Sequence, residues 1–438
     1  MLVSNRDRET LRELARRVAE IGALPVQQEK IKLWKALNGL KPVRPMVIVD
    51  EFPWHEIDVD GELELQTEDD VCRYFETKLR RILYAWKHTP VDMVVEPVVD
   101  VPIAIRGVDY GAGPSYTTGF LGLDKSERTV ATDSHSEVVS HQYFDQLATE
   151  EDLEKIVSPT IVVDEERTTR VEEKAHEIFD GVIAVEMQGY FLDFQPWDAI
   201  SEWRGVQPIL LDLADRPEFM HQIMSRYTDA YLSMLDQMEE QGLLGSNRLP
   251  LTFGQRVVQC SPDYTDDLPA DGFDPARPRP RHSARDCWTR GAAQIFGGVS
   301  PAMHQEFELE YSARWYSRFG LAYYGCCEEL HDRIDLLRKN IPNLRKISMS
   351  PTVNIEKGAE QIGGDFVFSR KPNPAVFVTD GWEPDAIERD IRETLEICDR
   401  YGCPVEFIMK DISTVHYKPQ RLWEWAEIAM RVVGDRHA

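Results

Sequence analysis

The sequence lacks any apolar run close to the roughly 20 residues that a membrane-spanning helix requires. Residues 1–10 are rich in charge and contain no apolar signal core. We therefore expect a cytoplasmic protein that has no membrane partner.

Basic residues are scarce relative to acidic ones. Lys and Arg total 50 against 76 Asp and Glu, which gives a formal net charge of −26. An acidic surface of this strength disfavours binding to the phosphate backbone of nucleic acids and to anionic membranes. Such a surface favours solubility and the docking of a partner that carries a basic patch.

Two kinds of short motif are also missing. The seven cysteines include no Cys-x-x-Cys pair and no regular spacing, so a disulfide framework is not expected. The sequence contains no Gly-rich phosphate-binding loop of either nucleotide type. ATP and dinucleotide cofactors are therefore disfavoured.

Apolar segments of strand length alternate with segments of helical periodicity along most of the chain. About eight such alternations favour an α/β protein with a parallel (β/α)8 TIM barrel over an open sheet. The predicted strands include residues 45–51, 92–103, 181–189, 208–217, 249–258, 319–325, 346–350, 366–370 and 405–411. The clearest predicted helices cover residues 68–88, 165–180, 217–242 and 420–432.

The organisation into domains follows from the same patterns. Two helices within residues 6–40 predict an N-terminal helical extension over residues 1–41, before a barrel over residues 42–438. Residues 106–145, rich in Gly, Tyr, Ser and Thr, predict a long irregular excursion. Residues 261–286, with several Asp and a Pro-Arg-Pro-Arg run, predict an inserted loop that could gate access to a site.

One stretch combines a strand ending with reactive side chains. The apolar run that starts at Phe319 stops at Gly325 and is followed by Cys326, Cys327 and Glu328. In parallel α/β proteins, ligands and catalytic groups gather where strands end. This stretch therefore predicts one wall of an active site, and the alternative is a cysteine that is ordinary core.

Other strand ends carry acids and cations. If the strands form a barrel, these side chains face one mouth, where they suit acid–base and oxyanion chemistry. For any single residue, the alternative is a solvated charge at the start of a loop. The predicted catalytic residues are Glu51, Arg370, Lys371, Lys410 and Asp411.

A metal site is a further hypothesis. Adjacent cysteines alternate in direction on an extended chain, so at most one of Cys326 and Cys327 should face the barrel axis. One thiolate with a carboxylate and an imidazole is a plausible ligand set for zinc, and the predicted ligands are Cys326, Glu328 and His304. The alternative for residues 304–310 is the polar face of a helix or strand.

Aromatic and amide side chains near the same elements would suit a planar or aromatic substrate, although such aromatics often serve packing alone. The predicted substrate-binding residues are Trp54, Tyr110, Gln188, Gln255 and Tyr324.

Three motifs carry a resemblance to a known family. They are Phe319-Gly-Leu-Ala-Tyr-Tyr-Gly-Cys-Cys-Glu, Phe368-Ser-Arg-Lys-Pro-Asn-Pro and Lys410-Asp-Ile-Ser-Thr. From about residue 42 to 432 the sequence resembles the uroporphyrinogen decarboxylase superfamily, which includes zinc- and corrinoid-dependent methyltransferases. The resemblance implies a (β/α)8 barrel with its active-site cleft at the carboxyl ends of the strands.

The departures from the family pattern narrow the implied activity. Decarboxylases of this family carry an Arg-rich segment after the first strand, whereas residues 46–54 here are acidic and aromatic, so a porphyrinogen with many carboxylates would be repelled. The methyltransferase branch has His-x-Cys where this chain has Tyr324-Gly325-Cys326. The resemblance implies an O-demethylase component, which transfers a methyl group from a methoxylated small aromatic molecule to a corrinoid (cobalamin) protein, with zinc as cofactor.

Two other functions remain open. A metal-free decarboxylase or lyase would bind a carboxylated small molecule through Arg370 and Lys371 and protonate the carbanion from Asp411. A non-enzymatic binding protein on the same barrel is the third reading, which the many acids at the mouth make less attractive. A homodimer is one option for the oligomeric state.

Overall fold

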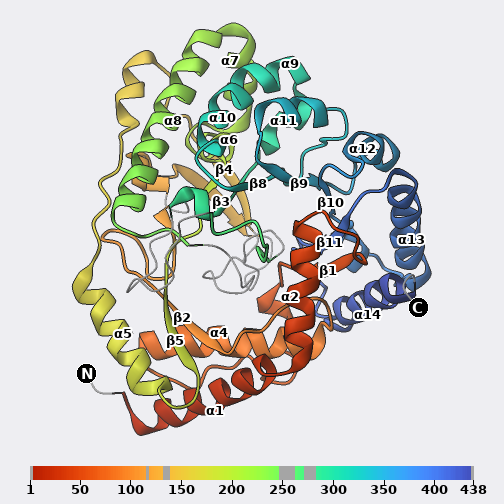
Figure 1. Ribbon diagram of the computed structural model, residues 1–438. Coiled ribbons are helices and arrows are strands. Elements are labelled where there is room, and N and C mark those ends of the chain that lie inside the picture. The colour runs from red at the N-terminus through yellow and green to blue at the C-terminus, as the bar shows by residue number, and fades with distance from the viewer. Residues whose placement is uncertain (1–2, 115–117, 132–138, 246–261, 271–282, 436–438) are drawn as a thin grey trace.

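The structure is a computed structural model that describes residues 3–114, 118–131, 139–245, 262–270 and 283–435 (Figure 1). Its centre is a seven-stranded sheet in which every neighbouring pair is parallel, in the order β1-β11-β10-β9-β8-β7-β6. The strands are β1 (Met46–Val49), β6 (Asp193–Phe194), β7 (Trp288–Gly291), β8 (Leu321–Tyr324), β9 (Leu344–Met349), β10 (Val367–Arg370) and β11 (Val405–Met409).

The other strands of the described residues form two smaller sheets. The strands β2 (Val98–Pro102) and β5 (Ala184–Gln188) form a separate parallel pair. The strands β3 (Glu127–Ala131) and β4 (Val139–Tyr143) form an antiparallel pair. The predicted α/β class is confirmed, but the described strands do not form one closed sheet, so the finer prediction of a TIM barrel is not established.

Helices lie around the outside of the strands, most clearly along the edge that α12, α13 and α14 occupy in Figure 1. No helix in the described part of the chain combines the length and the apolarity that crossing a membrane would need. The longest helices are α1 (Asn5–Gly22), α2 (Pro25–Asn38), α4 (Asp70–His88), α5 (Glu165–Phe179), α8 (Pro217–Glu240), α13 (Pro384–Tyr401) and α14 (Gln420–Asp435). The shorter α12 (Ile355–Ile362) lies between β9 and β10 in the chain.

Local sequence explains why these elements form where they do. All four residues of β1 are buried, as expected for a parallel strand covered on both faces. Helix α4 begins after Asp69, whose carboxylate accepts hydrogen bonds from the amides of Val71 and Cys72. Its buried residues Phe75 and Leu79 recur at helical spacing and pack into the main core.

Residues 208–217 were predicted as a strand, and this prediction is wrong, because they lie mostly in helix α7 (Val206–Asp215). The apolar run has helical spacing: Ile209 and Leu213 are buried, while Leu210 and Leu211 are among the exposed large hydrophobic residues. A run of four apolar letters was therefore misread as a buried strand.

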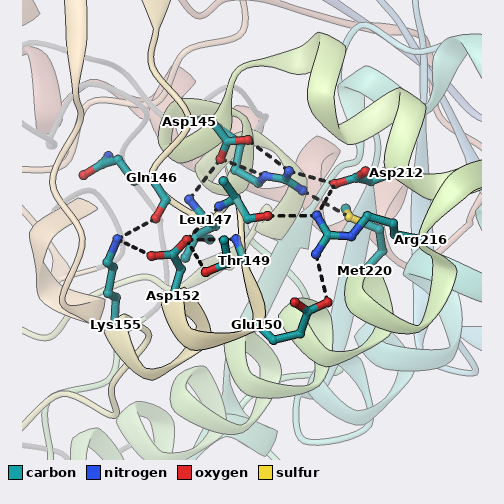
Figure 2. A network of polar contacts seen from close by, with 12 residues as sticks. Asp145, Gln146, Leu147, Thr149, Glu150, Asp152, Lys155, Asp212, Arg216 and Met220 are labelled. Atoms are coloured by element: carbon teal, nitrogen blue, oxygen red, sulfur yellow. Dashed lines mark hydrogen bonds and ion pairs between the residues drawn. The ribbon is translucent and has the colours of Figure 1, made fainter.

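Polar contacts tie α7 to the segment before it (Figure 2). Asp212 lies 2.8 Å from Arg204 and 3.6 Å from Arg216, the latter one turn away in sequence. Arg216 also donates to the carbonyl of Ala148 (2.8 Å) and to Glu150 (2.9 Å). These contacts hold residues 148–150 against the end of α7.

Two further expectations need comment. The β3–β4 pair lies inside residues 106–145, so the prediction of a wholly irregular excursion is wrong there. The strand predicted at 249–258 lies outside the described residues, as do residues 271–282 of the predicted insertion. The two N-terminal helices are present as predicted.

Candidate active site

Polar residues of β8 and β10, with the residues that directly follow β1, β10 and β11, meet on one side of the parallel sheet. We call this group the inner polar cluster. Because the strands are parallel, their carboxyl ends lie at one edge of the sheet, where the following loops begin. The cluster consists of Asp50, Tyr323, Ser369, Lys371 and Lys410.

Asp50 is the most unusual member of the cluster. It directly follows β1, is fully buried, and has no hydrogen-bond partner for either carboxylate oxygen within the described structure. Burial, helped by the charge of Glu51, raises its pKa well above the ordinary value, although Arg290, Lys371 and Lys410 act in the opposite direction. The raised pKa favours the protonated form of Asp50, with Arg290, Lys371 and Lys410 close enough to oppose the shift.

Lys371 is held at the centre of the cluster. Its ammonium group donates to the Ser369 hydroxyl (2.9 Å) and to the Tyr323 hydroxyl, and these two hydroxyls lie 2.8 Å apart. One layer deeper, Lys346 and Glu406 form a buried ion pair of 2.8 Å. Burial alone would raise the pKa of Glu406, but the charges of Lys346 and Lys371 hold it below the ordinary value.

Lys410 connects the cluster to the two thiols. Its ammonium group lies 2.8 Å from the Cys326 sulfur and 2.9 Å from an Asp411 oxygen. Burial favours the neutral amine, yet the neighbouring sulfur and carboxylate raise the pKa of Lys410 above its ordinary value. Lys410 is therefore charged.

Asp411 lies in a constrained turn beside Lys410. Its φ is 58°, a left-handed conformation that Asp tolerates better than most residues. Its amide donates to a Glu51 carboxylate oxygen at 2.6 Å, and its own carboxylate lies 3.3 Å from the Cys327 sulfur. Glu51, Lys410 and Asp411, predicted as catalytic residues, thus lie together.

The two predicted cations, Arg370 and Lys371, lie on opposite sides of β10. Lys371 lies in the inner polar cluster, whereas Arg370 donates to the carbonyl of Ser350 (2.6 Å) and lies 3.6 Å from Asp390 of helix α13. Adjacent residues of a strand point in opposite directions, so the two cations cannot share one ligand there. The expectation that both stabilise the same oxyanion does not fit this geometry.

The predicted zinc ligands do not converge either. Both carboxylate oxygens of Glu328 accept hydrogen bonds from backbone amides, one from Ala293 (3.0 Å) and one from Cys326 (2.8 Å). The His304 ring contacts Arg333 through Nδ1 (3.0 Å) and the Tyr324 hydroxyl through Nε2 (2.7 Å). No three His, Cys, Asp or Glu among the described residues are arranged to hold a metal ion, so this donor set does not fit zinc.

The pKa of Cys326 also disfavours zinc binding. A contact with the Cys327 sulfur (3.5 Å) and burial raise the pKa of Cys326 well above its ordinary value, more than the Lys410 charge lowers it. Zinc binds the thiolate rather than the thiol. The raised pKa therefore disfavours the thiolate that zinc would bind, and the Cys326 sulfur accepts a hydrogen bond of 2.8 Å from Lys410.

The predicted substrate-binding residues are dispersed. Trp54 and Tyr110 line one cavity, which lies beside helix α4. Tyr324 is buried on the side of β8 opposite to the inner polar cluster and contacts His304. Gln188 ends β5, where its carbonyl accepts the amide of Ile103 at 3.3 Å, and Gln255 lies outside the described residues.

Two acids with raised pKa values were not among the predicted catalytic residues. One is Asp50, and its position directly after an apolar strand was the sequence signal for it. The other is Asp198 of helix α6 (Pro196–Arg204), whose pKa burial raises to about 7, with a smaller contribution from Glu328. It accepts a hydrogen bond of 2.7 Å from Gln294, and its sequence context in Pro-Trp-Asp gives no comparable signal.

Comparisons with known proteins add little to this geometry. The chain matches no protein-family model and no curated protein. One solved structure, a methyltransferase from Methanosarcina mazei, is similar over 93% of this chain and 99% of its own length, with 14% identity and a TM-score of 0.49. A likeness of this size carries no argument about the reaction.

Proposed function

We propose that the protein is an enzyme in which Asp50, as a protonated acid, donates a proton to a small anionic substrate. The observation that carries the proposal is a fully buried carboxyl group with no hydrogen-bond partner for either oxygen, in the field of Arg290, Lys371 and Lys410. A carboxyl group kept neutral by burial is a suitable general acid near neutral pH.

The first candidate reaction is methyl transfer from a methoxylated aromatic molecule to a corrinoid on a separate protein, as the sequence resemblance implies. The reduced corrinoid would supply the nucleophile. When the bond between the methyl carbon and oxygen breaks, Asp50 protonates the leaving oxygen, and Lys371 and Lys410 stabilise its negative charge. Burial of the cluster excludes water from this step.

The second candidate is a carboxy-lyase, which the cations around Asp50 favour because they would bind a substrate carboxylate. In that reaction the bond between the carboxyl carbon and its neighbour breaks, carbon dioxide leaves, and the carbanion takes the Asp50 proton. Asp50 rather than Asp411 is the donor in this version, because Asp411 is paired with Lys410 at 2.9 Å.

A barrel with a single mouth would explain why these groups converge, and we include it in the proposal. The supporting contacts lie at the break between the two parallel sheets. The Asp92 amide, ahead of β2, donates to the Val47 carbonyl of β1 at 2.8 Å, and the Val47 amide donates to the Asp92 carboxylate at 2.9 Å. On the other side, β6 begins five residues after the end of β5.

One assay tests the proposal and separates its two reactions. Purified protein is incubated with a reduced corrinoid carrier and a panel of methoxybenzoates, and the corrinoid absorbance is followed together with release of carbon dioxide. Methyl transfer predicts a corrinoid change only with methoxylated substrates, whereas the lyase predicts carbon dioxide without the carrier. In both cases Asp50→Asn should lower turnover about 100-fold or more, and the exposed-site control Asp60→Asn should leave it unchanged. Turnover of Asp50→Asn close to that of the wild type would refute the proposal.

A further inference from the structure

Two thiols lie side by side just past the end of β8, and the proposed function uses neither of them. The sulfurs of Cys326 and Cys327 are 3.5 Å apart. Adjacent side chains point in opposite directions only where the chain is extended. Here β8 ends at Tyr324 and the chain turns at Gly325, whose φ is 101°. The turn brings the two sulfurs together.

The turn after β8 is held by contacts on both of its sides. The Cys326 amide donates to the Glu328 carboxylate at 2.8 Å, and the Ser348 hydroxyl donates to the Cys326 carbonyl at 2.9 Å. A Cβ atom on Gly325 would lie 2.4 Å from the Leu330 side chain, and the positive φ also requires glycine. The fold therefore fixes the position of both thiols.

The two thiols differ in their access to solvent. Cys326 is buried, whereas Cys327 is the one exposed cysteine in the described part of the chain. The Lys410 ammonium group lies 2.8 Å from the Cys326 sulfur and 3.7 Å from the Cys327 sulfur. The Cys327 thiol donates to the Asp411 carboxylate at 3.3 Å. A nearby cation stabilises a thiolate, and the carboxylate can take the thiol proton, so Cys327 is the thiol that an oxidant in solution meets first.

We infer that Cys326 and Cys327 form a vicinal dithiol that a hydroperoxide oxidises to a disulfide. In the first step the Cys327 sulfur attacks one peroxide oxygen. The S–O bond forms, the O–O bond breaks, and the other oxygen leaves with the thiol proton, as water when the oxidant is hydrogen peroxide. In the second step the Cys326 sulfur attacks the Cys327 sulfur. The S–S bond forms, the S–O bond breaks, and hydroxide leaves as water with the Cys326 proton.

Cys326 suits the second step and not the first. Burial and the contact with Cys327 raise its pKa, which makes it a poor nucleophile towards an oxidant in solution. Its sulfur already lies 3.5 Å from the sulfur that it attacks, and such positioning compensates for low intrinsic reactivity. The inference concerns a modification of the chain and does not depend on the proposed reaction.

The disulfide should be easy to reduce again. Adjacent Cα atoms lie about 3.8 Å apart, whereas disulfide-bonded residues usually have Cα atoms about 4.4–6.8 Å apart, so a bond between neighbours is strained. Strained disulfides are more oxidising and therefore more readily reduced. The modification is thus reversible.

A second cysteine pair provides a comparison within the same chain. Cys398, in α13, contacts Cys403, and this contact together with burial raises the pKa of Cys398. Both of these thiols are buried. A hydroperoxide should therefore leave this pair reduced under conditions that oxidise Cys326 and Cys327.

Mass spectrometry after mild oxidation tests the inference. The reduced full-length protein is treated with one equivalent of hydrogen peroxide, its remaining thiols are alkylated in denaturant, and the tryptic peptide of residues 319–333 is analysed, which contains no other cysteine. We expect this peptide to lack two hydrogen atoms and to carry no alkyl group until dithiothreitol is added. The peptides with Cys398 and Cys403 should be fully alkylated. A fully alkylated 319–333 peptide, a sulfinic acid in it, or preferential oxidation of Cys398 and Cys403 would overturn the inference.

Single variants assign the two steps. Cys327→Ser should oxidise at least about tenfold more slowly at residue 326, because the remaining thiol is buried. Cys326→Ser should react with peroxide like the wild type but stop at a sulfenic acid that dimedone traps. Lys410→Met should slow the first step at least about fivefold, because the attraction between the ammonium group and the thiolate is lost.

The control for these variants is Cys403→Ser, which removes a buried thiol and should oxidise at residues 326 and 327 like the wild type. Thermal unfolding of each variant confirms that it is folded. Oxidation of folded Cys327→Ser at the wild-type rate, or no trapped sulfenic acid in folded Cys326→Ser, would overturn the inference.

Discussion

Strand β8 places two adjacent tyrosines in two different polar environments. Tyr323 lies in the inner polar cluster, bonded to Ser369 and Lys371. Tyr324 lies on the opposite side and belongs to what we call the outer polar network, which consists of His304, Glu308, Tyr324 and Arg333. All seven side chains in these two sets of contacts are buried, so burial alone does not distinguish the two environments.

The hydrogen bonding of the buried polar residues does distinguish the two regions. In the outer polar network every residue has at least one hydrogen-bond partner, although one oxygen of Glu308 and the Nε of Arg333 have none within the described structure. Arg333 donates to the Phe296 carbonyl at 2.8 Å and to the Val299 carbonyl at 2.7 Å, besides its contact with His304. In the inner polar cluster Asp50 has a partner for neither oxygen. A buried network in which every residue has a partner is typical of structural support. A buried acid with a partner for neither oxygen, beside cations, is typical of a site that receives a ligand.

The largest effect should come from Asp50→Asn. We expect kcat to fall about 100-fold or more, because general acid catalysis contributes factors of that size. The folded-state pKa of Asp50 is raised, so its protonated form contributes stability at low pH that is lost as the pH rises through that pKa. The midpoint of thermal unfolding of Asp50→Asn, compared with wild type, should therefore improve as the pH is raised from 5 to 8. A variant that loses stability at every pH would place Asp50 with the outer polar network instead.

Arg333→Met, in the outer polar network, should instead act by destabilising the folded protein. It leaves the carbonyls of Phe296 and Val299 and the His304 ring without their shared donor, and such losses cost about 3 kcal/mol. Urea unfolding should show this loss against Arg314→Met, which removes an exposed pair with Asp229 and should cost less than about 0.5 kcal/mol. If both variants are equally stable, the network is not the structural support that we describe.

Lys371→Met tests the cationic part of the inner polar cluster. Lys371 is buried and lies between Tyr323 and Ser369, so its removal withdraws a charge from the substrate and a partner from both hydroxyls. We expect kcat/KM to fall about 10- to 100-fold, with the loss concentrated in anionic substrates. The matched variant Arg370→Met, on the other side of β10, should reduce stability while leaving the affinity for these substrates unchanged.

The sequence allowed most of the parallel strands and the long helices to be predicted, because their apolar periodicity depends on the local chain. The same reasoning failed at residues 208–217, where four consecutive apolar letters fit either a strand or a helix and only the exposure of Leu210 and Leu211 distinguishes them. It also missed the short strands β6 and β7, which have little periodicity of their own.

The sequence indicated which residues lie close together where each of them ended a strand, but it did not indicate the direction in which a side chain points. Glu51, Lys410 and Asp411 lie together, as the alignment of parallel strand ends implies. Which of two adjacent residues faces the cluster depends on the register of each strand, which the sequence did not fix for Arg370 and Lys371. The pKa of Asp198 depends on burial by segments distant in sequence, so no local pattern indicates it.

A smaller effect is expected at Asp198. Its pKa in the folded protein is about 7 against an ordinary value of 3.8, so the stability that it contributes is complete below about pH 4 and is lost as the pH rises through 7. Wild type should therefore lose a few degrees of thermal midpoint between pH 6 and 8 relative to Asp198→Asn. Asp229→Asn, at an exposed site, is the control, and parallel pH profiles for all three proteins would contradict the raised pKa.

The smallest effect should come from Cys326→Ser. A buried neutral thiol is neither a good nucleophile nor a zinc ligand, and a serine hydroxyl can still accept the hydrogen bond that Lys410 donates to the sulfur at 2.8 Å. We expect turnover within about threefold of wild type, because that one hydrogen bond is retained, and an identical metal content by elemental analysis. The variant Cys327→Ser, at the exposed neighbour, controls for nonspecific oxidation of a thiol.

If instead Cys326→Ser loses one equivalent of zinc together with activity, the leaving group is activated by the metal. Asp50 would then be an unsatisfied acid without the catalytic role assigned to it, and the contrast between the two sides of β8 would no longer separate function from structural support.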